Sequence, residues 1–344
     1  MIWIDCQEVR HDCLTTRQAL FFDTNIWIDL VENTTPVWRH LAGMLKQLVK
    51  ARVVFCPLAT PTIWELYRQP PACAPDVAQL MDTLSLRTAF ANRTEIFRAE
   101  VRNFVLGLVD RQRGMLSPRE VYVPVAHYLS TRLRLVFPNS YTGDEREAMT
   151  AAVTRRLGSV GVENLVSWRK NSTGLGRESI PPYSAARKSR RAQAGSSRTK
   201  ARNIEAEFVY DRHIEPALQS VMRSLSVSTR AQVMCCLASI EPDREGSRIE
   251  ALLEKMPALR NAVDLYTIAG FDPERKDRRA DFFDIEMLIA PFAYADVFVS
   301  QDRWIRHLIH KDLADRNQTA FVEGPEELTA FLEQIGKASI LSRP

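Results

Sequence analysis

The chain has 344 residues, of which 45% are hydrophobic and 26% are charged, with a formal net charge of +4. These values are ordinary for a soluble globular protein with one large domain or two modest ones. The net charge is too small to indicate a nucleic-acid partner by itself, and the six cysteines lack the paired or His-flanked spacing of a zinc site.

The sequence predicts a cytoplasmic protein. The opening MIWIDCQEVR has acidic residues where a secretory signal has basic ones. The longest apolar stretch, at 285–295, is too short to span a bilayer and contains Glu286 and Pro291. We therefore expect no contact with a membrane and cysteines that stay reduced.

Residues 15–75 have an α/β pattern. An apolar strand at 19–22 ends at Asp23-Thr24-Asn25, and a helical pattern follows it. A second strand at 53–55 precedes Thr60-Pro61, in which a hydroxyl and then a proline form a typical helix start. The helix that begins there carries Glu65.

Residues 76–274 have apolar residues at helical spacing and no convincing pair of strands. Capping boxes at Ser117–Glu120 and Thr142–Glu145 predict two of the helix starts. The stretch 171–202 is rich in Ser, Gly, Arg and Lys, which predicts a mobile loop. Its part 187–202 carries seven Lys or Arg and no acid, so attraction to phosphate is a second role for this segment. The candidate contacts with nucleic acid are Arg187, Lys188, Arg190 and Arg191.

Residues 275–344 return to the α/β pattern, with an apolar helix from about 281, strands at 297–300 and 319–322, and helices after each strand. Alternating strands and helices predict a parallel sheet with right-handed crossovers. The segments 15–75 and 275–344 together have about 130 residues, the size of one domain. We therefore predict a discontinuous α/β domain interrupted by a mostly helical insertion, 76–274.

Carboxylates follow the predicted strands. Asp23 ends the first strand, Asp302 follows the strand at 297–300, and Glu65 lies on the helix after the second strand. Asp281 and Asp284 are three positions apart and share a helix face. Because parallel strands present their carboxyl ends at one edge of a sheet, we expect these acids to converge there.

Converging carboxylates without Lys or Arg partners repel one another and raise one another's pKa values. A Mg²⁺ or Mn²⁺ ion removes that conflict, and two such ions can hydrolyse a phosphodiester. The pattern therefore predicts a metal site formed by Asp23, Asp284, Asp302 and Asp281, with Glu65 beside it.

Three assignments remain open at this point. Asp281 is either a ligand or an ordinary acid of the first helical turn. Glu286, on the same helix, is an alternative to Asp284, since it lies roughly 200° around the helix from Asp284 and both cannot face one site. Asp296 is either a further acid of the site or a cap of the next strand.

The segment DTNIWIDL after an apolar strand, the helix with Glu65, the apolar helix with Asp284 and the segment VSQDRW resemble the PIN domain family of metal-dependent nucleases. The resemblance covers the two outer segments and not the insertion. It implies a three-layer fold with a central parallel sheet. In this resemblance Asp23, Glu65, Asp284 and Asp302 match the four acidic catalytic positions, and Thr24 and Asn25 match the supporting polar ones.

The resemblance implies an endoribonuclease that cleaves single-stranded or structured RNA with Mg²⁺ or Mn²⁺. Many family members are toxins of toxin–antitoxin pairs or effectors of bacterial defence, so an inhibitor or complex partner protein is a further expectation. The alternatives are a DNA nuclease and a catalytically silent nucleic-acid-binding or assembly subunit. Near Asp302 we expect Arg303 and Arg306 to contact the substrate backbone or only the solvent, and Trp304 to stack on a base or join the core.

Overall fold

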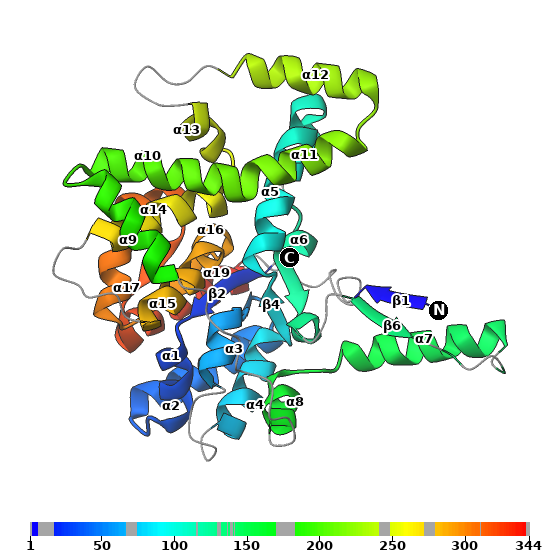
Figure 1. Cartoon of the computed structure of the whole chain (residues 1–344). Helices are drawn as coiled ribbons and strands as arrows, with labels where there is room; N and C mark the ends of the chain where they lie inside the picture. The colour runs from blue at the N-terminus through cyan, green and yellow to red at the C-terminus, as the bar shows by residue number, and fades with distance from the viewer. Residues whose placement is uncertain are drawn as a thin grey trace.

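The computed structural model in Figure 1 describes most of the chain as a mostly helical α/β protein. The described residues are 2–5, 17–66, 74–114, 116–128, 132–135, 137, 140, 142–169, 183–240, 248–271, 279–309 and 311–341.

A four-stranded parallel sheet joins the two outer segments of the sequence, as the strand pattern predicts. The strand order is β3-β2-β7-β8, so β2 and β7 lie at the centre although one comes from each outer segment. All four predicted strands are present. Their bounds are Gln18–Phe22 (β2), Val54–Phe55 (β3), Val297–Val299 (β7) and Ala320–Val322 (β8).

Helices cover both faces of this sheet. Successive residues of a strand point to opposite faces, and β2 buries Phe21 in one core and Phe22 in the other. This two-sided burial explains why the last four residues of β2 are all apolar. The Phe22 side contains α1 (Thr24–Glu32), α2 (Pro36–Lys50), α3 (Thr60–Leu66), α4 (Ala74–Ser85) and α19 (Gly324–Leu341). The Phe21 side contains α5 (Arg93–Val109), α14 (Pro257–Phe271), α15 (Arg279–Ile289), α16 (Pro291–Tyr294), α17 (Arg303–Leu308) and α18 (Lys311–Asn317).

The expectation that 76–274 lacks strand pairs is wrong. Within it β4 (Thr88–Phe90) pairs with β5 (Tyr122–Pro124) in antiparallel fashion. The strand β6 (Arg132–Leu135) pairs with β1 (Ile2–Asp5). Strands this short show no readable periodicity. In addition, β4 follows Leu86 and Arg87, which both have positive φ. Glycine is the usual residue in that conformation, and neither position is a glycine, so the sequence does not indicate the turn.

The expected mobile loop at 171–202 is also wrong where the structure describes it, since α9 (Tyr183–Ala194) and α10 (Arg198–Val209) lie there. Arg190 pairs with Glu205 at 2.9 Å, and its guanidinium lies 4.0 Å from the ring centre of Phe208. The basic residues that suggested a solvated loop thus include one that joins two helices. The first part of the stretch lies outside the described residues.

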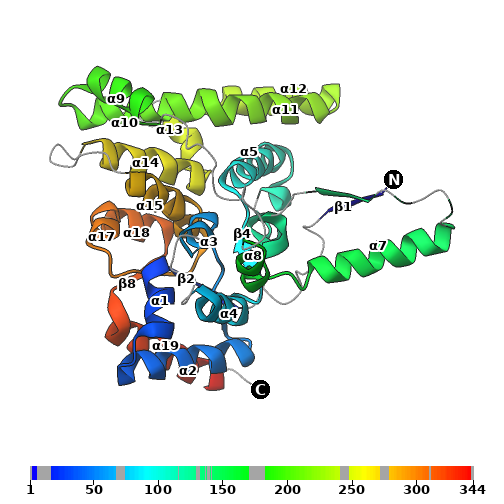
Figure 2. The same cartoon turned by 60° about the horizontal axis from the view of Figure 1, so that its bottom comes forward.

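Several other helices of the middle region lie away from the sheet (Figure 2). Figure 2 shows α10, α11 and α12 along one side of the molecule, and α7 beside the β1–β6 pair on another. Both predicted capping boxes are confirmed, at the starts of α6 and α7. The remaining elements are η2 (Arg111–Arg113), α6 (Pro118–Val121), η3 (Val125–Tyr128), α7 (Gly143–Leu157), α8 (Val162–Arg169), the π-helix η4 (Tyr210–Ile214), α11 (Glu215–Ser224), α12 (Val227–Ala238) and α13 (Arg248–Leu253).

A buried carboxylate fixes the start of α14. Glu100 of α5 accepts hydrogen bonds from the backbone N–H groups of Ala258 and Leu259, at 2.7 and 3.0 Å, and from the hydroxyl of Tyr294. Burial raises the pKa of Glu100 to about 7, against the lowering effect of these hydrogen bonds. Glu100 therefore ties α5, α14 and α16 together.

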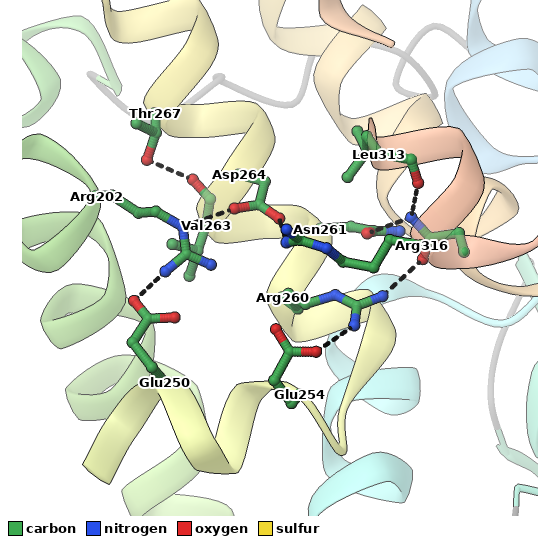
Figure 3. A network of polar contacts seen from close by, with 11 residues as sticks. Arg202, Glu250, Glu254, Arg260, Asn261, Val263, Asp264, Thr267, Leu313 and Arg316 are labelled. Carbon is green, nitrogen blue, oxygen red and sulfur yellow. Dashed lines mark hydrogen bonds and ion pairs between the residues drawn. The ribbon is translucent and has the colours of Figure 1, made fainter. Parts of the chain in front are cut away.

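Charged side chains then connect α14 to its neighbours on two sides (Figure 3). Asp264 of α14 accepts from Arg202 of α10 at 2.9 Å and from Arg316 of α18 at 3.4 Å. Arg202 also pairs with Glu250 of α13. Because α18 belongs to the C-terminal α/β segment, this network joins the insertion to the sheet domain.

No helix in the described ranges is both long and apolar enough to cross a membrane.

Phe298 of β7 lies at the centre of the core and is fully buried, with its ring centre 5.2 Å from that of Phe21 and 5.9 Å from that of Phe292. We expect Phe298→Ala to lower the free energy of unfolding by about 3–5 kcal/mol, because it removes a large buried ring and leaves a cavity. Urea denaturation followed by circular dichroism measures this. Val227→Ala, at a site that is 83% exposed, is the control and should change stability by less than about 0.5 kcal/mol.

Candidate functional site

Asp23 lies where β2 ends and α1 begins. Its backbone N–H donates to the carbonyl of Val299 at 3.1 Å, which continues the pairing of β2 with β7 by one residue. Its side chain makes no capping bond to α1, although it occupies the N-cap position. The carboxylate is 4% exposed and is directed toward the end of β7 instead.

Ser300 connects Asp23 to Asp302. Its hydroxyl donates to the Asp23 carboxylate at 2.9 Å and accepts the backbone N–H of Asp302 at 3.0 Å. Asp302 in turn caps α17, accepting the N–H of Trp304 at 2.6 Å. Sequence reasoning did not single out Ser300. The available signal was a hydroxyl residue two positions before an Asp, directly after an apolar strand.

Glu65 reaches the same edge of the sheet from α3. The Thr24 hydroxyl donates a hydrogen bond to the Glu65 carboxylate, so the residue after Asp23 positions the second acid. Thr24 is buried, whereas Asn25 is exposed. Of the two expected supporting residues, Thr24 therefore has a defined contact within the site.

Asp23 has a raised pKa, from its ordinary value of 3.8 to about 6. Burial is the largest cause, and the carboxylates of Glu65 and Asp302 raise the pKa further. The hydrogen bond from Ser300 and the adjacent backbone N–H of Thr24 act in the opposite direction. Three acids predicted from distant parts of the sequence thus act on one another at one place.

The helix α15 packs against α3 and carries the remaining predicted acids. Asp284 is half-buried on it. Glu286 points elsewhere, since its carboxylate pairs with Arg93 and accepts from the Tyr266 hydroxyl at 2.6 Å. The Glu286 alternative is therefore wrong. The side chain of Asp281 lies outside the described residues.

Asp296 belongs to the opposite end of β7. Its carboxylate accepts the backbone N–H of Ala19 at 2.7 Å, where β2 and β7 begin to run side by side. Of the two interpretations left open by the sequence, the cap is the one that the structure shows.

The donor set of the site consists of carboxylate and hydroxyl oxygens, which are the ligands that Mg²⁺ and Mn²⁺ prefer. Over the described part of the chain, however, no three His, Cys, Asp or Glu side chains are placed so that they could hold a metal ion. Asp302 caps α17 and Glu65 accepts from Thr24. The chemistry of the residues fits a divalent ion, and their present positions require side-chain movement before three of them share one.

The predicted nucleic-acid contacts are dispersed. Arg303 is exposed at the start of α17, and Arg306 pairs with Glu323 at 2.6 Å. Arg190 is engaged with Glu205, and Arg191 is half-buried on α9. The side chains of Arg187 and Lys188 lie outside the described residues.

Trp304 joins the core rather than offering a surface for a base. It is 7% exposed, and its ring stacks on that of His307 with centres 5.4 Å apart. The exposed partner of this stack is His307.

Searches against protein-family models, curated proteins and solved structures found no match to this chain.

The pKa of Asp23 makes stability depend on pH. An acid with a raised pKa in the folded state binds its proton more tightly there than in the unfolded chain, so stability falls as the pH rises from about 4 to about 6. Without divalent metal, we expect Asp23→Asn to be more stable than the natural protein by about 1–3 kcal/mol at pH 8. The difference should vanish near pH 4. Thermal melting in EDTA at both values tests this, and a variant destabilised at pH 8 would contradict it.

Proposed function

We propose that this protein is a divalent-metal-dependent endoribonuclease of the PIN-like type, with Mg²⁺ or Mn²⁺ bound by Asp23, Glu65, Asp284 and Asp302. One observation carries the proposal. Asp23 is buried at the carboxyl edge of the two central strands, and the nearby carboxylates of Glu65 and Asp302 oppose its ionisation. Asp284 is included because its helix packs against the one that carries Glu65.

Such an arrangement favours a cation. Among the groups that act most strongly on the Asp23 pKa within the described residues, none is a cationic side chain. A divalent ion would offset the repulsion and, when bound, would polarise a phosphodiester and activate a water molecule. The protein's own part is to orient the ligands: Ser300 orients Asp23, and Thr24 orients Glu65.

The parallel sheet, with Asp23 and Asp302 following the carboxyl ends of its two central strands, also supports a PIN-like domain, because the resemblance implies a central parallel sheet and an acidic site. The preference for RNA over DNA rests on the resemblance of the sequence segments to the family, as does a role as a toxin or defence effector with an inhibitor partner. Metal-assisted hydrolysis at phosphorus does not itself distinguish the two nucleic acids. The choice between them depends on contacts with the sugar.

Cleavage of RNA tests the proposal directly. We expect the purified protein to cut single-stranded RNA or tRNA with Mn²⁺ and not with EDTA, and Asp23→Asn to lose at least about a hundredfold in rate, because it removes a metal ligand. The control is Asp315→Asn, which removes an exposed carboxylate of α18 and should leave the rate unchanged. Undiminished cleavage by Asp23→Asn would refute the assignment, and cleavage of single-stranded DNA alone would identify a DNA nuclease.

A catalytically silent subunit is the second candidate, and one observation favours it. The acids of the described chain do not form an assembled three-ligand metal site. In this case the acids would have no catalytic role, and the helical insertion would bind a partner or nucleic acid.

Metal binding separates the two candidates. If the site is catalytic, millimolar Mn²⁺ should raise the melting temperature of the natural protein by several degrees and have little effect on Asp23→Asn, because binding to the folded state alone adds to its stability. Isothermal calorimetry provides the binding constant. Equal responses of the two proteins would favour the silent subunit.

A further inference from the structure

A groove with a volume of about 600 Å³ separates α5 from the chain that runs through η4 into α11. It contains none of the carboxylates at the edge of the parallel sheet. Its walls carry apolar side chains, among them Phe97, Ala217 and Val221, together with hydroxyls of Thr94 and Ser220. Its charged residues are Glu95, Arg98, Arg102, Glu120 and Arg212, and His213 lies among them.

One wall of this groove is a π-helical turn. Pro216 has no backbone N–H to donate to the carbonyl four residues earlier, and its ring crowds that turn, so a regular α-helix cannot continue through it. The chain widens instead over Tyr210–Ile214, where the N–H of Glu215 bonds to the carbonyl of Tyr210, five residues back. Arg212 and His213 belong to this widened turn and line the groove. Turns of this kind frequently form functional sites in other proteins.

The acids of the groove already have partners. Glu120 accepts from Arg102 and, at 2.8 Å, from the side-chain amide of Asn103. The carboxylate of Glu95 lies 2.9 Å from the imidazole of the buried His127. Arg98 and Arg212, by contrast, form no ion pair with any of the described residues, and both are exposed. The groove therefore has two guanidinium groups whose charge is not matched within the described structure.

The state of His213 is consistent with this concentration of positive charge. Its pKa is lowered to about 4, mainly by burial and also by the guanidinium groups of Arg93, Arg212 and Arg98. His213 is therefore neutral at physiological pH, so it can both donate and accept a hydrogen bond. Its ring lies edge-on to Phe97, with centres 5.0 Å apart, and forms an aromatic wall next to the two arginines.

We propose that this groove is a second binding site, which takes a phosphate group carried by a nucleotide. Arg98 and Arg212 would bind the phosphate from the two sides, since guanidinium groups match phosphate oxygens in pairs. The side chain of Val221 and the ring of His213, which packs on the buried Phe97, would contact the apolar part of the ligand. A volume of about 600 Å³ is typical of small-molecule sites. A free nucleotide and a nucleotide within an RNA strand carry the same group, and the site does not depend on the carboxylates being catalytic.

Binding measured in EDTA tests this site without any cleavage. One probe is ADP in isothermal calorimetry, and the other is a short fluorescein-labelled single-stranded RNA in anisotropy titrations at several salt concentrations. The test variant is Arg98→Ala/Arg212→Ala. The control is Arg39→Ala/Arg155→Ala, which removes the same charge from exposed positions on α2 and α7. We expect the test variant to bind at least one probe about tenfold more weakly or worse, while the control stays within about twofold.

The outcomes distinguish the source of the phosphate. Loss of ADP binding alone identifies a free nucleotide as the ligand. Loss of RNA binding identifies an RNA strand as the ligand. In that case the slope of log affinity against log salt concentration should fall by about one to two released counterions. Equal affinities of test and control variants for both probes, or no binding of either probe by the natural protein, would overturn the proposal. If the alanine variant has a lowered melting temperature, Arg98→Gln/Arg212→Gln, which retains hydrogen-bonding side chains, replaces it as the test variant. RNA binding retained by Asp23→Asn would support this site even if that protein and its parent cleave nothing.

Discussion

The parallel pairing of β2 with β7 is the interaction on which the rest of the structure depends. It aligns Phe21 with Phe298 and Phe22 with Val299, and the N–H of Asp23 extends the ladder by one bond. This register brings Ser300 to the Asp23 carboxylate although the two residues are 277 positions apart. A slip of one residue would turn Phe21 and Phe22 toward the wrong cores and separate the acids, so the packing of two faces fixes the site as well as the fold.

The middle segment, 76–274, joins the sheet through a shared apolar core and through polar contacts of α14 and α5. Glu100 binds the first N–H groups of α14, and Asp264 on the same helix takes one arginine from α10 and one from α18 (Figure 3). Asp264 is buried in these pairs, whereas Arg202 and Arg316 are partly exposed, so the pairs stabilise the junction less than fully buried ion pairs would. The helix α5, which lines the groove, is therefore bonded to α14, and α14 is bonded to α18 of the C-terminal segment.

The sequence and the structure agree where the local signal is strong and differ where it is short or depends on a partner. Runs of apolar residues predict the four strands of the main sheet, and the residues directly after them place Asp23 and Asp302 beyond the carboxyl ends of the central strands. The capping boxes follow from their own Ser/Thr–Glu spacing. The sequence does not predict the strands β4 and β5, because three residues give no period and the turn before β4 needs two positive φ angles. Arg190 appeared to belong to a solvated loop because its partner Glu205 lies on the next helix.

By itself, the sequence determined which acids follow buried strands, because apolar runs and the residues that end them are local features. Tertiary structure decided which acids meet. It directed Glu286 to Arg93, assigned Asp296 to the far end of β7, and introduced Ser300 as the link between Asp23 and Asp302. The direction of a side chain depends on helix packing and strand register, which only the folded chain defines. The widened turn beside α5 is a similar case. Pro216 in the sequence predicts an irregular helix, but the groove exists only because α5 packs against this irregular turn.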